Sequence, residues 1–324
     1  MQSAGDNSTM EVDLMLYREF GSTGWQISAI GMGTWNIGNQ WGELDDMTAW
    51  GTVRAAFDAG MNLFDTAESY GIPNGMSEMR LGEALSGIRH QVYVVSKIGH
   101  WGQRTGQGVP YTTVDMIRMS CHASLHRLRT DWIDVMLCHV ADIDDPSIFL
   151  EAFDVLQQRG KIRLYGISTN DLEVVKRFNV DGTCSVVEVD YSLLHTQPEE
   201  EFLPYCAEQG IAVLVRGPLR QGLLAGKYDL ETEFTDSVRE PFNVGGERRE
   251  AYERDIAGVE RLAQVVEPGE EMVTAALRFT ISHSADPVSI PGCKSPEQAR
   301  ANAAVGDRTL TSDEMAALRG ALEG

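Results

Sequence analysis

Polar and ionisable residues end several of the apolar runs in this chain. Asp65, Lys97 and His139 each end such a run, and Tyr70 follows Asp65 by five positions. Lys is depleted in strands and is seldom fully buried unless it is paired, so Lys97 calls for an explanation. A buried Lys beside an Asp and a Tyr would lower the pKa of the Tyr from its free value of about 10. Such a Tyr could protonate a carbonyl oxygen, or accept the proton of an alcohol in reverse, while His139 orients the same oxygen.

These residues can act together only if the fold brings the strand ends to one place. Helical stretches separate the apolar runs, as in repeated βα units. The expected strands lie near residues 27–33, 61–65, 92–97, 133–139, 162–168, 186–191, 211–216 and 288–291. Eight strands alternating with helices predict an α/β fold, a (β/α)8 TIM barrel. In that fold the function sits at the carboxyl ends of the strands.

Other segments complete the expected architecture. Residues 17–28 predict an N-terminal β-hairpin with a Gly-rich turn. A helix is expected over 113–129, and another from Asp45 or Asp46 to Gly60 with Met47 on its buried face. Residues 217–247 are rich in Gly, Pro and charge and predict a long loop after the seventh strand, of the kind that is usually functional or disordered.

The sequence also predicts the character of the N-terminal residues and the number of domains. Residues 1–14 are expected to be a disordered N-terminal tail, because they show neither apolar periodicity nor the pattern of a signal peptide. Residues 15–324 are expected to form a single barrel domain.

The composition narrows the range of partners. The formal net charge is −21, with 48 acidic and 27 basic residues, so nucleic acid and anionic membranes are poor partners. No apolar run reaches the length of a transmembrane helix. The five cysteines show no Cys-x-x-Cys spacing, which favours a cytoplasmic protein without disulfides or a metal site. An anionic ligand would need the scarce basic residues gathered around it.

The segment 62–71, Asn-Leu-Phe-Asp-Thr-Ala-Glu-Ser-Tyr-Gly, resembles the signature of the aldo-keto reductases. The resemblance extends from about Leu16 to about Leu322, and it includes the helix, turn and strand of residues 124–134. It implies a catalytic tetrad in this chain of Asp65, Tyr70, Lys97 and His139.

The resemblance also implies a nicotinamide cofactor, NADP(H), with NAD(H) as the alternative. Residues 166–168 resemble the turn that holds the nicotinamide carboxamide. Residues 217–228 resemble the loop over the pyrophosphate, and residues 290–298 resemble the adenosine-phosphate site. The implied cofactor-binding residues are Gly33, Thr34, Trp35, Asp65, Ser168, Asn170, Glu188, Arg216, Gly217, Pro218, Leu219, Gly222, Leu224, Lys227, Gly292, Lys294, Ser295, Gln298 and Asn302.

The chain departs from the family pattern at several of these positions. Thr169 intervenes where the family often has Asn directly after the Ser, and Glu188 stands where Gln is usual. An ionised Glu188 would accept from the carboxamide and favour the positively charged, oxidised ring. Arg216 replaces an aromatic residue, and it could stack on the ring and offset Glu188. Gln298 stands where many NADP-specific members have Arg, which predicts weak binding of a 2′-phosphate.

The resemblance implies an NADP(H)-dependent oxidoreductase that transfers a hydride between nicotinamide and the carbonyl or alcohol carbon of a sugar or small aldehyde. Tyr70 would be the general acid and base. Trp35, Tyr70, Trp101 and His139 would line the substrate pocket. An NAD-preferring sugar or polyol dehydrogenase and a cofactor-sensing, non-catalytic subunit are the alternatives. The substrate, the direction of reaction and the oligomeric state stay open.

Overall fold

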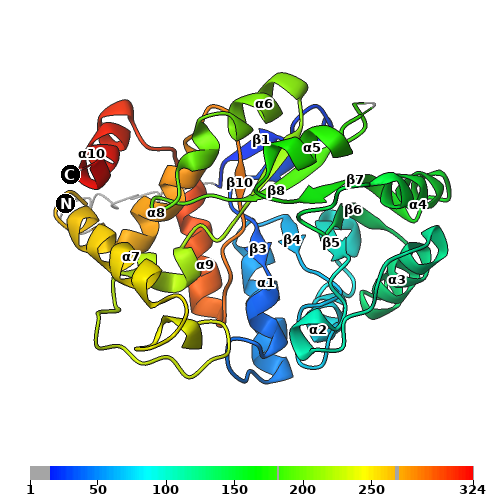
Figure 1. Ribbon diagram of the computed structural model, residues 1–324, viewed down its shortest axis with the longest axis horizontal. Coiled ribbons are helices and arrows are strands. Elements are labelled where there is room, and N and C mark those ends of the chain that lie inside the picture. Colours follow the sequence, from blue (N-terminus) through cyan, green and yellow to red (C-terminus); the bar gives the residue numbers. More distant parts are fainter. Residues whose placement is uncertain (1–14, 181, 267–269, 324) are drawn as a thin grey trace, which may run out of the picture.

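Eight parallel strands form the centre of the structure, a computed structural model that describes residues 15–180, 182–266 and 270–323 (Figure 1). Each strand pairs with the next one along the chain. The strands are β3 (Met32–Gly33), β4 (Leu63–Asp65), β5 (Tyr93–Ile98), β6 (Ile133–Cys138), β7 (Ile162–Ser168), β8 (Val186–Asp190), β9 (Ala212–Arg216) and β10 (Val288–Ser289). Parallel bridges from Ile30 to Ser289 and from Gly33 to Gly292 join the two outer strands. The predicted barrel is confirmed, and the predicted tail lies outside the described residues.

Helices alternate with the strands and surround them (Figure 1). They are α1 (Asp46–Asp58), α2 (Met76–Ala84), α3 (Val114–Arg127), α4 (Ser147–Gln158), α5 (Leu172–Phe178), α6 (Phe202–Gln209), α7 (Arg249–Leu262), α8 (Met272–Ile281), α9 (Pro296–Ala304) and α10 (Ser312–Glu323). None of the helices within the described ranges has the length and apolar character needed to cross a membrane.

Alternation along the strands decides which side chains enter the barrel. The apolar core inside the barrel includes Leu63, Val95, Leu137, Val186 and Leu214. The residue two positions further along each chain segment falls on the same side: Asp65, Lys97, His139, Glu188 and Arg216. The barrel interior is therefore apolar in its middle and polar at the carboxyl ends of its strands.

The N-terminal hairpin pairs β1 (Tyr17–Glu19) with β2 (Gln26–Ser28), as predicted. Phe20 and Ile27 are buried in the same core as the interior strand residues, so the hairpin packs against the barrel. The first barrel strand was predicted over 27–33, but residues 26–28 belong to the hairpin and only 32–33 pair with β4. A Cβ on Gly33 would lie 2.6 Å from the Ile290 carbonyl oxygen, and this close approach explains the Gly there.

Two predicted helices are present with identifiable caps. Thr113 accepts a hydrogen bond from the Met116 amide before α3, and Asp45 accepts one from the Thr48 amide before α1. The prediction that Met47 lies on the buried face of α1 is wrong, since its side chain is 72% exposed. The buried face contains Ala49, and two residues along a helix correspond to about 200°, so Met47 points the opposite way.

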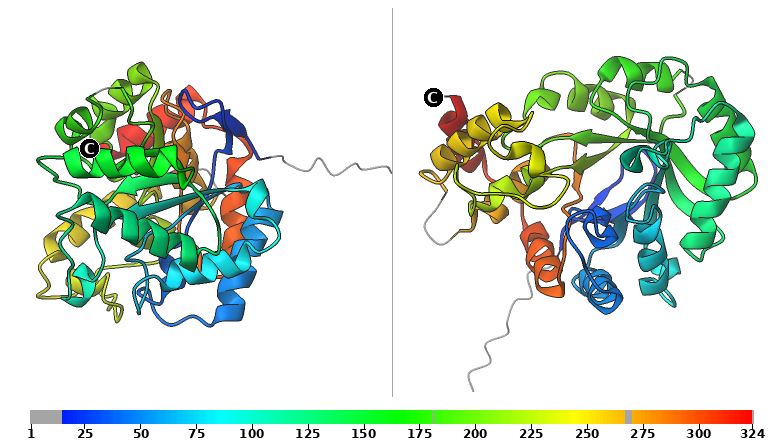
Figure 2. Two further views of the ribbon diagram at one scale, coloured as in Figure 1. Left: turned by 90° about the vertical axis from the view of Figure 1, so that its right-hand side faces the viewer. Right: turned by 60° about the horizontal axis from the view of Figure 1, so that its bottom comes forward.

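The long segment 217–247 packs with α7 around a small apolar cluster. The cluster consists of Leu223, Phe234, Phe242, Tyr252 and Ile256. Two short 3-10 helices, η5 (Arg220–Ala225) and η6 (Glu240–Phe242), lie within the segment 217–247. Figure 2 (right) shows this segment in yellow-green on the opposite side of the molecule from α3 and α4.

Candidate active site

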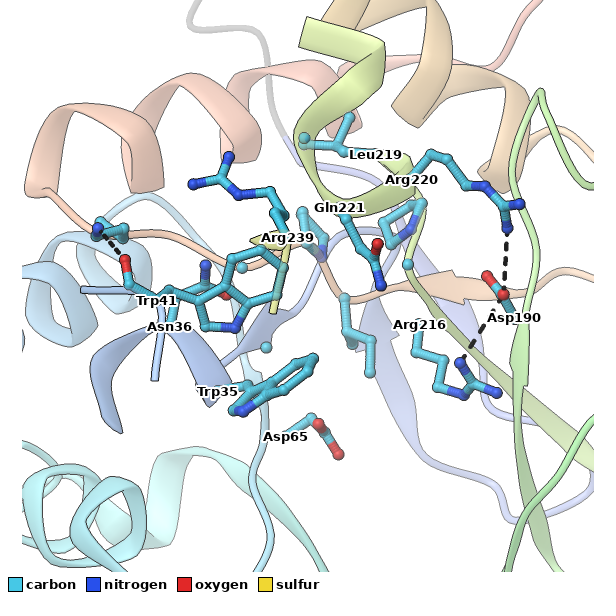
Figure 3. Close-up of a pocket in the computed structure, with 18 of the residues that line it drawn as sticks. Trp35, Asn36, Trp41, Asp65, Asp190, Arg216, Leu219, Arg220, Gln221 and Arg239 are labelled. Atoms are coloured by element: carbon cyan, nitrogen blue, oxygen red, sulfur yellow. Dashed lines mark hydrogen bonds and ion pairs between the residues drawn. The ribbon is translucent and has the colours of Figure 1, made fainter. Parts of the chain in front are cut away.

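A cavity of about 720 Å³ lies at the carboxyl ends of the barrel strands. Its wall combines residues at the strand ends, residues of the segment 217–248 and residues of α9 (Figure 3). Sixteen predicted site residues line it: Gly33, Trp35, Asp65, Tyr70, His139, Ser168, Arg216, Gly217, Pro218, Leu219, Gly222, Lys227, Gly292, Lys294, Gln298 and Asn302. The structure thus brings together residues from every part of the chain that the sequence singled out.

Behind this wall lies a buried cluster of charges around Lys97. The Lys97 ammonium is fully buried and donates to Asp65 Oδ1 and to the Thr66 carbonyl oxygen, the latter at 3.0 Å. It also donates to the Tyr70 hydroxyl at 3.3 Å. Glu188 Oε2 lies 3.1 Å from the same nitrogen, within ion-pairing distance. The Lys97 ammonium therefore contacts two carboxylates and the Tyr70 phenol, which the sequence predicted to be catalytic.

Burial and charge act in opposite directions on this cluster. Burial raises the pKa of Asp65 well above its ordinary value, and the charge of Glu188 raises it further, while Lys97 opposes both. Burial lowers the pKa of Lys97, but the negative charges of Asp65 and Glu188 outweigh burial and raise it overall. Lys97 is therefore held as a cation although no water reaches it.

Aromatic rings surround the Tyr70 hydroxyl on the cavity side. The Trp35 ring stacks on Tyr70 with centroids 5.7 Å apart, and Trp41 meets Trp35 edge-on at 5.0 Å. The His139 ring stands edge-on to Tyr70 at 6.1 Å, and His100 stacks on His139 at 4.6 Å. These five rings make a compact aromatic pocket that includes the Tyr70 phenol.

The remainder of the cavity is strongly basic. Its lining contains six Lys or Arg residues: Arg216, Arg220, Lys227, Arg239, Arg248 and Lys294. Only two carboxylates line it, Asp65 and Asp190. Asp190 lies 3.7 Å from Arg220 and 4.0 Å from Arg216 (Figure 3). In a chain of net charge −21, such a gathering of cations favours an anionic ligand.

Two buried polar atoms of the cavity wall also point to a ligand. Gln221 Oε1 and Trp41 Nε1 have no hydrogen-bond partner among the described residues. Buried polar atoms are rarely left unsatisfied in native proteins. An acceptor, a donor and six cations suit a ligand with phosphates, hydroxyls and an amide or amine. A nicotinamide dinucleotide meets that description, and the lining residues fit it.

Helix α9 presents one face to the basic part of the cavity. Gln298 and Asn302, four residues apart on α9, line it together with Lys294, which precedes the N-cap residue Ser295. The Lys294 ammonium donates to the Trp41 carbonyl oxygen at 2.6 Å, which holds its charge at the wall (Figure 3). Ser295 caps the helix by accepting from the Gln298 amide at 3.3 Å. The positive end of the helix therefore lies beside this wall.

Five residues predicted to bind the cofactor do not line the cavity. Three of them hold backbone or packing in place: Thr34 donates to the Asp65 carbonyl oxygen, Ser295 caps α9, and Leu224 is buried in apolar packing. The extra residue Thr169 displaces Asn170, which is exposed and accepts from Arg216 and from the Asp190 amide.

The fifth of these residues is Glu188, and a separate correction concerns Trp101. Glu188 accepts from Ser168 at 3.2 Å and pairs with Lys97, so it lies behind Ser168 rather than at the cavity surface. Arg216 does not offset it, since Arg216 pairs with Asp190. Trp101, predicted in the substrate pocket, lines a separate depression, where Arg127 lies 4.9 Å from its ring centre.

Several lining residues escaped the sequence reading. They include His100, Asp190, Arg220, Gln221, Arg239 and Arg248. The basic residues among them could have been found, because an acidic chain with a charged loop after the seventh strand has a reason to keep cations there. No local sequence pattern predicts that His100 or Asp190 lines the cavity. Among the described residues, no group of three or more His, Cys, Asp or Glu is arranged to hold a metal ion.

Comparison with known proteins identifies a family and several similar proteins. The model of the aldo/keto reductase family matches residues 29–323. The NADH-specific methylglyoxal reductase of Escherichia coli is 30% identical over 327 residues, covering 92% of this chain and 96% of the relative. The glycerol dehydrogenase structure of Gluconobacter oxydans gives a TM-score of 0.79 at 28% identity, covering 97% and 96% of the two chains. An aldo-keto reductase of Klebsiella pneumoniae, solved in complex with NADPH, gives 0.70 at 26%, covering 94% of each.

Proposed function

Because this chain belongs to the aldo/keto reductase family, a family of oxidoreductases, we propose that it interconverts a small carbonyl compound and its alcohol with a nicotinamide cofactor held in the cavity. The observation that carries the proposal is the contact of the Lys97 ammonium with the Tyr70 hydroxyl, beside the cavity and inside a buried charge cluster. The cofactor would supply or accept the hydride.

The residues of this chain would manage the proton and the substrate oxygen. Tyr70 would give its proton to the carbonyl oxygen, and Lys97 would stabilise the phenolate that remains. Asp65 would hold Lys97 in place through their direct contact. His139, edge-on to Tyr70, would orient the same oxygen. Ser168 and the basic wall would position the cofactor, and the aromatic rings would exclude water from the reacting atoms.

A small, oxygen-rich carbonyl compound fits the aromatic pocket best. Trp35 and Trp41 offer apolar faces, while His100 and His139 offer ring nitrogens, all from the same wall. The relatives whose names give a substrate include a methylglyoxal reductase, a glycerol dehydrogenase and an L-galactose dehydrogenase. We therefore propose short aldehydes, ketoaldehydes and small sugars as the substrate class.

A cofactor titration followed by a turnover panel tests the proposal. Protein fluorescence would be followed as NADPH or NADH is added, and turnover would then be measured on short aldehydes and sugars in both directions. We expect binding of at least one cofactor and reduction of at least one aldehyde. Tight binding without turnover would instead support a cofactor-sensing subunit, and the absence of binding would refute the proposal.

The cofactor preference depends on Lys294 in our proposal. We expect Lys294→Met to weaken NADPH binding about tenfold or more, because a charge-assisted hydrogen bond to a 2′-phosphate contributes about 1.5–3 kcal/mol. Binding of NADH, which lacks that phosphate, should change little. Fluorescence titration of both cofactors measures the two affinities, and Lys176→Met, at an exposed surface pair, is the control.

An NAD-preferring dehydrogenase is the second candidate. The Gln298 side chain accepts from the Lys294 amide at 2.8 Å, so it is engaged locally rather than offering a cation to a phosphate. The NADH-specific relative also favours it. Equal losses of NADPH and NADH affinity in Lys294→Met, or no loss of either, would support this candidate over NADP(H).

A further inference from the structure

The second carboxylate on Lys97 is the least expected feature of the charge cluster. We propose that Glu188 is a positioning residue that acts through Lys97 and sets the pH at which Tyr70 transfers its proton. The inference deepens the proposed function and rests on it. It differs from the role expected from the sequence, in which Glu188 would touch the cofactor.

Glu188 and Lys97 meet across the inside of the barrel. They lie on β8 and β5, which are not neighbours in the sheet. Each stands two positions beyond an interior Val, Val186 and Val95, so both side chains enter the barrel. Glu188 is 1% exposed and Lys97 is fully buried, so water screens their interaction very little. A charge at position 188 is therefore felt throughout the cluster.

The ammonium of Lys97 has fewer protons than it has oxygen neighbours. A Lys ammonium carries three N–H donors. Four oxygens lie within 3.3 Å of it: Asp65 Oδ1, the Thr66 carbonyl oxygen, Glu188 Oε2 and the Tyr70 hydroxyl. Asp65, Thr66 and Tyr70 accept hydrogen bonds from this ammonium, whereas Glu188 Oε2 has no hydrogen-bond partner among the described residues. Glu188 Oε2 nevertheless lies 3.1 Å from the nitrogen, nearer than the Tyr70 hydroxyl at 3.3 Å.

Charge predicts the direction of the effect. Loss of the Tyr70 proton would add a negative charge beside a cation that already neighbours two carboxyl groups, and an ionised Glu188 opposes that loss. A neutral Gln at position 188 would remove this repulsion. Tyr70 should then lose its proton at lower pH.

Asp65 limits the size of the effect. Burial raises its pKa, and the charge of Glu188 raises it further. Replacing Glu188 therefore lowers the pKa of Asp65, so Asp65 gains part of the negative charge that Glu188 loses. A shift of about one pH unit remains, smaller than that expected from removing a whole charge at this depth.

The other charged or titratable groups near these strand ends include Glu68, which accepts from the Gly99 amide at 2.8 Å, and the cavity-lining residues His100, His139, Asp190 and Arg216. Arg216 lies 4.0 Å from Asp190, and His100 stacks on His139. Substitution at position 188 leaves these pairs in place. Their effect on the titration midpoint of Tyr70 should therefore be the same in the wild type and in the variant.

The test is a direct titration of Tyr70. The nine tyrosines would be labelled with carbon-13 at the ring carbon that bears the hydroxyl and followed by NMR against pH, with Tyr70→Phe assigning the signal. We expect the midpoint of Tyr70 in Glu188→Gln to fall by about one pH unit below that of the wild type. In turnover assays, the alkaline limb of carbonyl reduction should move to lower pH by the same amount.

Two further variants make the result specific. Glu78→Gln removes another fully buried carboxylate, which is held by Arg127 and Ser96, and it should leave the Tyr70 midpoint unchanged. Glu188→Asp keeps the charge and should give a midpoint closer to the wild type than Glu188→Gln does. An unchanged midpoint in Glu188→Gln, or the same shift in Glu78→Gln, would overturn the inference. The NMR readout needs no turnover, so it judges Glu188 even if the proposed reaction fails.

Discussion

Tyr70→Phe should lose about 10²- to 10⁴-fold in kcat for carbonyl reduction while still binding the cofactor. The substitution removes only the hydroxyl that Lys97 contacts at 3.3 Å, and the ring keeps its stacking on Trp35. Phe has no proton to give, so the substrate oxygen would develop charge without an acid beside it. Steady-state kinetics on an aldehyde substrate, together with a fluorescence titration of the cofactor, measures both effects.

The matched control removes a comparable hydroxyl away from the cavity. Tyr165 is buried and donates to Asp154 at 2.9 Å on the helix-facing side of β7. Tyr165→Phe should cost about 1 kcal/mol of stability and leave kcat nearly unchanged. A Tyr70→Phe variant that retained wild-type kcat would show that another group supplies the proton, and the proposed mechanism would be wrong.

Lys97→Met should be the most destabilising of the substitutions considered, by about 3–5 kcal/mol at neutral pH. Met fills much of the same volume but leaves Asp65 and Glu188 buried without their cation. Turnover should be lost as well, because Tyr70 would lose its charged neighbour. Chemical denaturation followed by circular dichroism gives the free energy of unfolding. Lys176→Met, which breaks an exposed pair with Glu173, should leave it nearly unchanged.

The loss in Lys97→Met should depend on pH with a definite sign. Lys97 lowers the pKa of Asp65, so its removal raises that pKa further above the ordinary value. A carboxyl group with a raised folded-state pKa takes up protons on folding, and its contribution to stability is lost as pH rises towards that pKa. The variant should therefore be closer to the wild type near pH 5 than near pH 8. An equal loss at both values would contradict the assignment of a buried carboxylate pair.

The sequence by itself determined the barrel and most of the predicted residues that line the cavity. Repeated apolar runs and helices predicted eight strands, and the two-residue period of a strand decides which side chains enter the barrel. This rule follows from local geometry alone, and it places Asp65, Lys97 and His139 at the interior end of their strands. The same rule applied to Val186 would have placed Glu188 inside the barrel as well.

Only the tertiary structure decided which of these side chains touch. The contact of Glu188 with Lys97 spans strands that are not paired, so it depends on the width of the barrel and on the reach of both side chains. Neither quantity can be read from the spacing of residues along the chain. The tertiary structure also decides where the side chains of loops lie. Trp101 lies on Arg127 and outside the cavity, whereas Arg239 lies in the cavity wall. Their positions depend on long-range packing, because no periodic pattern fixes where a loop side chain points.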